Sequence, residues 1–167
     1  MSLTTKQKQE LRKVIRELAQ IRGRHTELVS IYIPADYDLN KIVSHIQQEI
    51  GTASNIKDAK TRKNVTDSLE KAVHYLRLYK KTPENGLAVF VGNVAAQEGK
   101  TDLKVWGIEP PEPIKTRIYR CDQYFLLELL EDMLEHKEGY GLIVLDRREA
   151  TLGFLKGTSI TSTVRLT

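Results

Sequence analysis

Cysteine, long apolar runs and adjacent glycines are nearly or wholly missing from this sequence of 167 residues. Cys121 is the only cysteine, which excludes a disulfide within the chain and argues against a cysteine-based zinc site. No stretch approaches about 18 consecutive apolar residues, and the N-terminal segment MSLTTKQKQE lacks the apolar core of a secretory signal. We therefore expect a soluble cytoplasmic protein with no membrane association and no metal or other cofactor.

Charge is distributed unevenly along the chain, although the net charge is only +4. Residues 57–81 contain eight bases and three acids, whereas residues 122–138 contain six acids and one base. A basic element of this kind is either a solvated helix face or a surface for nucleic acid. Both interpretations stay open at this point.

The hydrophobic pattern predicts an α+β fold, an α/β sandwich in which helices cover a small, mainly antiparallel sheet. Glycines and prolines divide the chain into helices and strands, and the length suits one domain with part of a second. Helices are expected at residues 4–20, 39–50 and 123–137, with a further one of about six turns that reaches Tyr79. Strands are expected at residues 28–33, 87–91, 103–108, 114–120, 140–145 and 151–155.

The second and third helices are joined by so short a polar linker that they should form an antiparallel hairpin with an exposed tip. Gly51 is expected to end the second helix, and the tip reads GTASNIKD. Capping accounts for Ser54 and Asn55, and Asn-x-x-Asp ending at Asp58 resembles a capping box. An exposed Ile56 beside Lys57 is not explained by capping, and a cationic apex suits contact with an RNA groove.

Catalytic signatures are missing from the sequence. It contains no GxSxG, GxxxxGK or GxGxxG motif, and its four histidines are scattered over different elements. His45, between Val43 and Ile46, is expected to flank a helix rather than act as a base. Cys121 lies before a predicted helix start that could favour a thiolate, but a packing role is the better interpretation.

Four segments resemble the archaeal and eukaryotic class I peptide chain release factors, in particular the archaeal branch. GTASNIK at residues 51–57 is similar to the family's codon-reading motif, and residues 119–125 keep its Tyr-x-Cys-x-x-x-Phe spacing. Residues 76–87 and 141–146 match the segment after the third helix and the first strand of the family's middle domain. Two departures stand out: Asp58 replaces a serine, and the family's Gly-Thr-Ser falls on residues 25–27, where only Thr26 is kept.

The resemblance implies that residues 1–137 form a stop-codon recognition domain and that residues 138–167 begin the middle domain. The family's Gly-Gly-Gln motif is absent, so this chain should bind without catalysing, whereas its parent would promote peptidyl-tRNA hydrolysis. The implied partners are the decoding site of the small ribosomal subunit and an mRNA stop codon. A translational GTPase would bind through a C-terminal part not present here, and the chain should be a monomer.

The resemblance also implies roles for particular side chains. Lys57 would donate to O4 of the first uridine, and Glu49 would accept from the purines that follow. Lys60, Arg62 and Lys63 would contact the RNA backbone. The full set implied for codon recognition is Thr26, Glu49, Thr52, Ser54, Asn55, Ile56, Lys57, Asp58, Tyr119, Cys121, Asp122 and Phe125.

Alternatives remain for two residues and for the function. Phe125 could be a core side chain rather than a stacking surface, and Glu49 could only cap or pair on its own helix. A ribosome-rescue module of the pelota type would bind the decoding site without reading a codon. The tip motif argues against that alternative, because the pelota branch lacks it.

Overall fold

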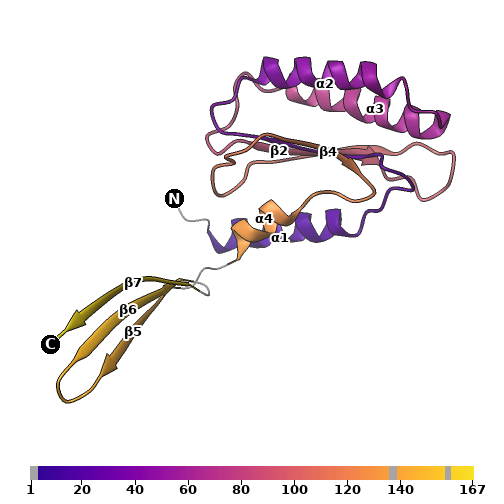
Figure 1. Ribbon diagram of the computed structural model, residues 1–167. Helices are drawn as coiled ribbons and strands as arrows, with labels where there is room; N and C mark the ends of the chain where they lie inside the picture. Colours follow the sequence, from indigo (N-terminus) through magenta and orange to yellow (C-terminus); the bar gives the residue numbers. More distant parts are fainter. Residues whose placement is uncertain (1–3, 136–138, 157–158) are drawn as a thin grey trace. The chain divides into compact units, whose positions relative to one another are not determined.

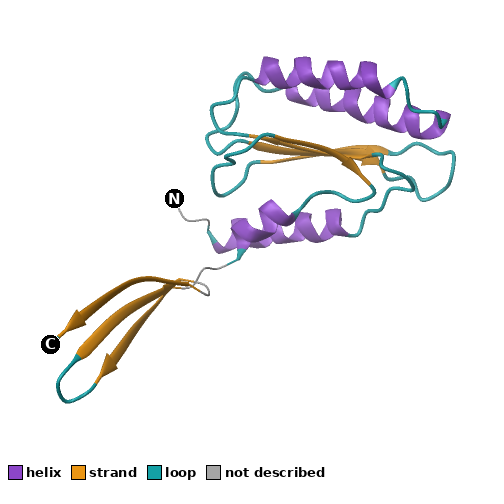
Figure 2. Ribbon diagram, viewed as in Figure 1, coloured by secondary structure: helices purple, strands orange, loops and turns teal. Residues whose placement is uncertain are grey.

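The computed structural model describes residues 4–135, 139–156 and 159–167, which form two compact units, Met1–Met133 and Leu134–Thr167. The first unit contains a four-stranded sheet in the order β3-β2-β1-β4, in which every neighbouring pair is antiparallel. Helices α2 and α3 cover one face, and α1 and α4 cover the other (Figures 1 and 2). This arrangement confirms the predicted α+β sandwich. The elements are α1 (Thr5–Ala19), β1 (Leu28–Ile33), α2 (Leu39–Ala53), α3 (Ala59–Leu76), β2 (Leu87–Asn93), β3 (Leu103–Ile108), β4 (Ile118–Asp122) and α4 (Glu128–Leu134).

Strand β1 lies in the interior of the sheet, and all six of its residues are buried. Because side chains alternate along a strand, Val29 and Ile31 pack into the cluster under α2 and α3, and Tyr32 points to the opposite face. There the Tyr32 ring meets Phe90 edge to face, with ring centres 5.7 Å apart, and its hydroxyl donates to the Leu126 carbonyl. Burial on both faces explains why the strand does not alternate apolar and polar residues and has Ser30 as its only small polar side chain.

The helices begin at capping residues. Thr4 and Gln7 form a reciprocal capping box at the start of α1, and the Asp38 carboxylate accepts from the Asn40 amide at the start of α2. The turn before β2 requires glycine, because Gly86 has φ +90° and a β-carbon there would lie 2.3 Å from the Ile33 carbonyl oxygen. These local devices set where the elements begin.

Several predicted boundaries are wrong. Helix α2 continues through Gly51 to Ala53, because burial of Ala53 offsets the roughly 1 kcal/mol that glycine costs in a helix. Helix α3 has 18 residues and ends at Leu76, about one turn earlier than predicted. Strand β4 begins at Ile118 rather than at residue 114.

The helix predicted for residues 123–137 is far shorter, since α4 spans only Glu128–Leu134. The preceding backbone bonds to other segments instead: the Gln123 carbonyl accepts from the Gly23 amide, and the Leu126 amide donates to the Ser30 hydroxyl at 3.0 Å. Tertiary partners therefore replace helical ones. The predicted helix end at residue 137 and the domain boundary between residues 137 and 138 lie outside the described residues.

The second unit contains one antiparallel sheet in the order β5-β6-β7. Its strands are β5 (Gly139–Leu145), β6 (Ala150–Lys156) and β7 (Ser159–Leu166), of which β7 was not predicted. Asp146 shapes the turn between β5 and β6 by accepting from the amides of Arg148 and Glu149. Across the described parts of both units, no helix is long and apolar enough to cross a membrane.

Candidate functional site

The α2–α3 hairpin tip presents two polar side chains to solvent. Asn55 and Lys57 are exposed, and no hydrogen bond or ion pair joins Lys57 to another residue within the described ranges. Ile56 between them is only partly exposed and packs against the core between the sheet and helices α2 and α3. The expectation of an exposed isoleucine is therefore wrong, and Ile56 anchors the loop that displays its two neighbours.

Two further side chains hold the tip in place. The Arg62 guanidinium donates to the Ile56 carbonyl oxygen at 2.9 Å, so this predicted backbone-binding residue already braces the tip loop. The hydroxyls of Thr52 and Ser54 donate to carbonyl oxygens of their own helix, at Gln48 and Gly51 respectively. These three predicted site residues already form hydrogen bonds inside the tip region.

Asp58 is the N-cap of α3 and does not lie in its first turn. Its carboxylate accepts from the Thr61 amide at 2.7 Å and from the Thr61 hydroxyl at 2.8 Å. These hydrogen bonds lower the pKa of Asp58, and the nearby charge of Lys60 acts in the same direction. The cap residue is thus Asp58 and not Asn55, and the serine usual in the family could fill the same position.

A second group of predicted residues gathers where the edge strand β4 meets α2. Tyr119 and Cys121 face the α2 side of the sheet and share a hydrogen bond of 3.2 Å between hydroxyl and sulfur. Glu49 lies at the end of α2, and the Nε2 atom of His45, one turn earlier, is 3.5 Å from its carboxylate. The His45 ring in turn meets the Tyr119 ring edge to face at 5.5 Å. We call Glu49, Tyr119, Cys121 and His45 the edge cluster.

Burial controls protonation in the edge cluster. Desolvation raises the pKa of Tyr119 and of Cys121, and the nearby Glu49 charge adds to both increases. Cys121 lies within β4, well before α4 begins at Glu128, and packs against the core, so no helix start activates a thiolate there and the packing interpretation fits the structure. Tyr119 keeps its proton and remains a hydrogen-bond donor. His45 was missed as a member, although its spacing of four residues from Glu49 on one helix was a usable signal.

The structure does not bring Asp122 and Phe125 into the edge cluster. Cys121 pairs with Val29 and Asp122 pairs with Leu28, so Asp122 projects from the opposite face of the sheet, where it binds Arg120 at 2.6 Å. Phe125 is 5% exposed, and its ring packs edge to face against Phe90 and Trp106 at 5.5 and 5.8 Å. The core interpretation of Phe125 is confirmed.

Thr26 is exposed in the loop between α1 and β1, next to the buried Glu27. The Glu27 carboxylate accepts from the Asn64 side chain at 2.9 Å and from the Arg24 amide at 3.3 Å, which ties this loop to α3. Sequence reasoning treated Glu27 only as a departure from a family motif. The buried Glu27 carboxylate therefore has a structural role, because its hydrogen bonds hold the loop that carries Thr26.

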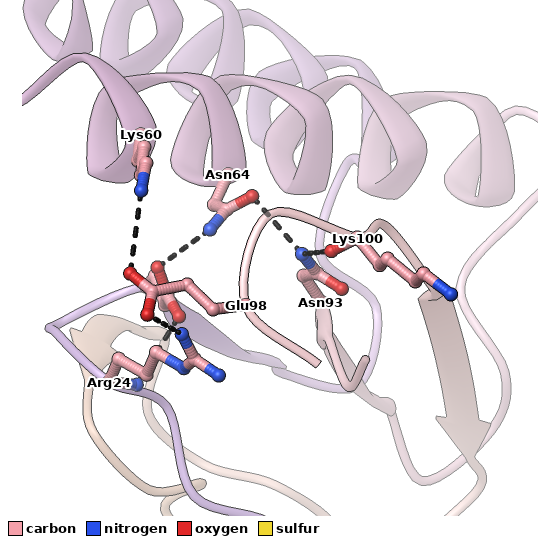
Figure 3. Close-up of polar contacts among 7 residues, drawn as sticks. Arg24, Lys60, Asn64, Asn93, Glu98 and Lys100 are labelled. Atoms are coloured by element: carbon pink, nitrogen blue, oxygen red, sulfur yellow. Dashed lines mark hydrogen bonds and ion pairs between the residues drawn. The ribbon is translucent and has the colours of Figure 1, made fainter. Parts of the chain in front are cut away.

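Three basic residues of α3, Lys60, Arg62 and Lys63, already have partners within the protein. Lys60 lies 3.4 Å from Glu98, and Lys63 forms an ion pair with Asp67 one turn later (Figure 3 shows the Glu98 contacts). Among the described residues, no three His, Cys, Asp or Glu side chains gather as a metal site would require. What the surface offers is hydrogen-bond donors and acceptors at the tip and at the sheet edge.

These features define an α+β domain that displays hydrogen-bonding side chains on a helical-hairpin tip and on an adjoining sheet edge. A family model described as eRF1 domain 1 matches residues 6–135, and the chain therefore belongs to that family. This confirms the resemblance seen in the sequence.

Relatives of the chain include archaeal proteins named peptide chain release factor subunit 1. The protein from Thermococcus onnurineus is 56% identical over 160 residues, covering 96% of this chain and 39% of the relative. The protein from Methanocaldococcus jannaschii is 43% identical over 167 residues, with 99% and 40% covered. Among solved structures, the archaeal translation termination factor aRF1 is 34% identical with a TM-score of 0.71, covering 94% of this chain and 44% of that one. The chain thus spans about two fifths of the length of these relatives.

Proposed function

We propose that this chain recognises stop codons in the ribosomal A site and that a longer parent protein uses it to terminate translation. The observation that supports this most directly is the edge cluster, which places Glu49 beside Tyr119 and Cys121 at the end of the helix that leads to the Lys57 tip. Sequence-specific RNA recognition needs unpaired bases and groups directed at their edges. The tip and the edge cluster supply such groups on two adjacent elements.

The chemistry of each group suits one part of a stop codon. The Lys57 ammonium is a donor only, so it would bind the O4 acceptor of the first uridine and disfavour cytosine, which presents an amino group there. Glu49 is an acceptor and would take the N–H protons of the purines that follow. Tyr119 remains protonated and offers a donor and a ring edge, and exposed Thr26 and Asn55 complete the polar surface. Asp122 and Phe125 lie on the other face of the sheet and would act only indirectly.

The proposal extends to the organisation of the parent. Residues 1–137 would be the recognition domain, and residues 138–167 would be the first strands of a middle domain. This chain has no Gly-Gly-Gln motif, so it would bind without releasing peptide, while its parent would promote peptidyl-tRNA hydrolysis. We further propose a cytoplasmic monomer whose GTPase partner binds to a more C-terminal part of the parent.

The test measures binding of the chain to ribosomes that carry UAA or the sense codon CAA in the A site. We expect preference for UAA, with Lys57→Ala losing about 1–3 kcal/mol of discrimination, or about 5- to 150-fold in affinity ratio. The control Lys115→Ala removes another exposed positive charge and should keep the preference for UAA. Thermal unfolding should be unchanged in both variants. Equal binding to the two codons by the unmodified chain would reject codon recognition and favour a rescue module that binds without reading.

A further inference from the structure

A polar cavity of about 570 Å³ lies between the α1–β1 loop, the first turns of α3 and the β2–β3 loop. Its lining includes five bases and two acids, a net charge of +3 when histidine is neutral. One of the acids, Glu27, is buried and bound to Asn64. The bases are Arg22, Arg24, Lys60, Lys63 and Lys100. A concave site with this balance attracts an anion.

The second acid, Glu98, lies between two of the bases that line the cavity. Its Oε2 atom lies 3.1 Å from a terminal nitrogen of Arg24, and its Oε1 atom lies 3.4 Å from Nζ of Lys60 (Figure 3). Each carboxylate oxygen therefore faces one cation, and the two cations come from separate segments of the chain. The two non-bridging oxygens of a phosphodiester can make the same pair of contacts.

The loop that carries Glu98 is anchored at its base. The Asn93 amide group donates to the Lys100 carbonyl at 3.1 Å and to the Asn64 side chain at 3.3 Å. Its oxygen accepts from the backbone amides of Ala95 and Asp102 at 3.1 and 2.9 Å. These bonds, partly visible in Figure 3, fix the loop beside α3, so the position of Glu98 follows from the fold.

The Glu98 contacts can nevertheless be exchanged for others. The side chains of Arg24, Lys60 and Glu98 are 48%, 71% and 68% exposed. Solvent screens ion pairs of this kind, which contribute little to stability. The hydrogen bond and charge of Lys60, together with the charge of Arg24, lower the pKa of Glu98, so it is ionised at neutral pH. A competing anion can displace it without unfolding the domain.

We propose that Arg24 and Lys60 form a binding site for an RNA backbone phosphate and that Glu98 occupies this site in the free protein as an internal substitute. The proposal rests on the RNA-binding function argued above. It adds a competition: RNA gains the two cations only by displacing Glu98. Binding of RNA that makes no other specific contact is therefore weakened in the free protein.

The test uses a short oligouridylate, which has backbone phosphates and no stop codon, and compares Glu98→Gln with Glu112→Gln. Glu112 is exposed, lies outside the cavity and gives the same change in net charge. Glu98→Gln should bind about two- to fivefold more tightly than Glu112→Gln at low salt, because it removes the internal competitor. The gain should vanish when Lys60→Gln is added, and Lys60→Gln alone should reduce the salt slope by about 0.7.

Equal or weaker binding by Glu98→Gln, an unchanged salt slope in Lys60→Gln, or no binding of any variant would overturn the phosphate site. The codon preference of the unmodified chain on UAA and CAA ribosomes is measured separately. If that preference is absent while the Glu98→Gln gain persists, the proposed function fails and the phosphate site stands. If the preference is present without the gain, the function stands and the phosphate site fails.

Discussion

Replacing Phe125 separates a core role from an RNA-stacking role. The ring is 5% exposed and packs edge to face against Phe90 and Trp106, on the face of the sheet opposite the edge cluster. Phe125 also closes the space above Gly92, where an added β-carbon would lie 3.6 Å from the ring. The residue therefore supports the β1–β2 region of the sheet and does not touch the surface proposed to meet RNA.

The magnitude follows from burial. Truncating a buried phenylalanine to alanine removes its transfer free energy and leaves a cavity, which together cost about 3–5 kcal/mol. Phe125→Leu keeps most of the apolar volume and should cost about 1–2 kcal/mol. Tyr124→Ala is a matched control, because this neighbouring ring is 52% exposed, and it should cost less than about 1 kcal/mol.

The assay pairs urea unfolding with codon discrimination on UAA and CAA ribosomes. Phe125→Ala should lose most of the stability of the domain, whereas Phe125→Leu should fold and keep the codon preference. The reasoning is refuted if Phe125→Ala loses less than about 1 kcal/mol. It is equally refuted if Phe125→Leu keeps its stability but loses codon preference, since the ring would then contact RNA.

Two further predictions concern Asp58 and Cys121. Asp58→Ser should slightly lower the unfolding temperature, because serine can cap α3 but has no charge. It should strengthen RNA binding, most of all at low salt, where the carboxylate beside Lys57 is least screened. Weaker RNA binding at every salt concentration would mean that Asp58 contacts RNA directly. The pKa of Asp58 is lower in the folded protein than in the unfolded chain. Its contribution to stability is therefore present above the unfolded value of about 3.9 and is lost as the pH falls through the folded pKa. The unfolding free energy of Asp58→Ser should consequently fall less steeply as the pH is lowered. The raised pKa of Cys121 has the opposite sign: its contribution is present below about 8.5, the unfolded value, and is lost as the pH rises further. Cys121→Ser should flatten that alkaline decline, and identical slopes would show that burial does not hold the thiol neutral.

Local pattern was enough for much of the fold. Strands β1 and β3 have the predicted bounds, because an apolar run ended by proline and a short run between loops are signals contained in the segments themselves. The α2–α3 hairpin followed from helical periodicity, a short linker and capping residues. Family membership was also readable, since it depends on motifs that lie in order along the chain.

Other features depend on partners far away in the sequence. The segment before α4 has helical composition, yet Gly23 and Ser30 take its backbone groups and Phe125 enters the core. Gly51 stays helical because Ala53, two residues later, is buried in the core. In both places a tertiary contact outweighs a local preference worth about 1 kcal/mol.

The features of the candidate site also fall into those that the sequence predicts and those that depend on distant contacts. The sequence alone nominated Lys57, Glu49, Tyr119 and Cys121 as candidates for recognition, because they fall on motifs that can be read along the chain. Only the tertiary structure decided that Phe125 is core, that Arg62 braces the tip, and that Glu98 neutralises Lys60. The physical reason is that both properties depend on distant segments. The partners of Glu98 are 38 or more residues away along the chain, and the burial of Phe125 depends on how the whole sheet packs. Neither can be read from the neighbours of a residue along the chain.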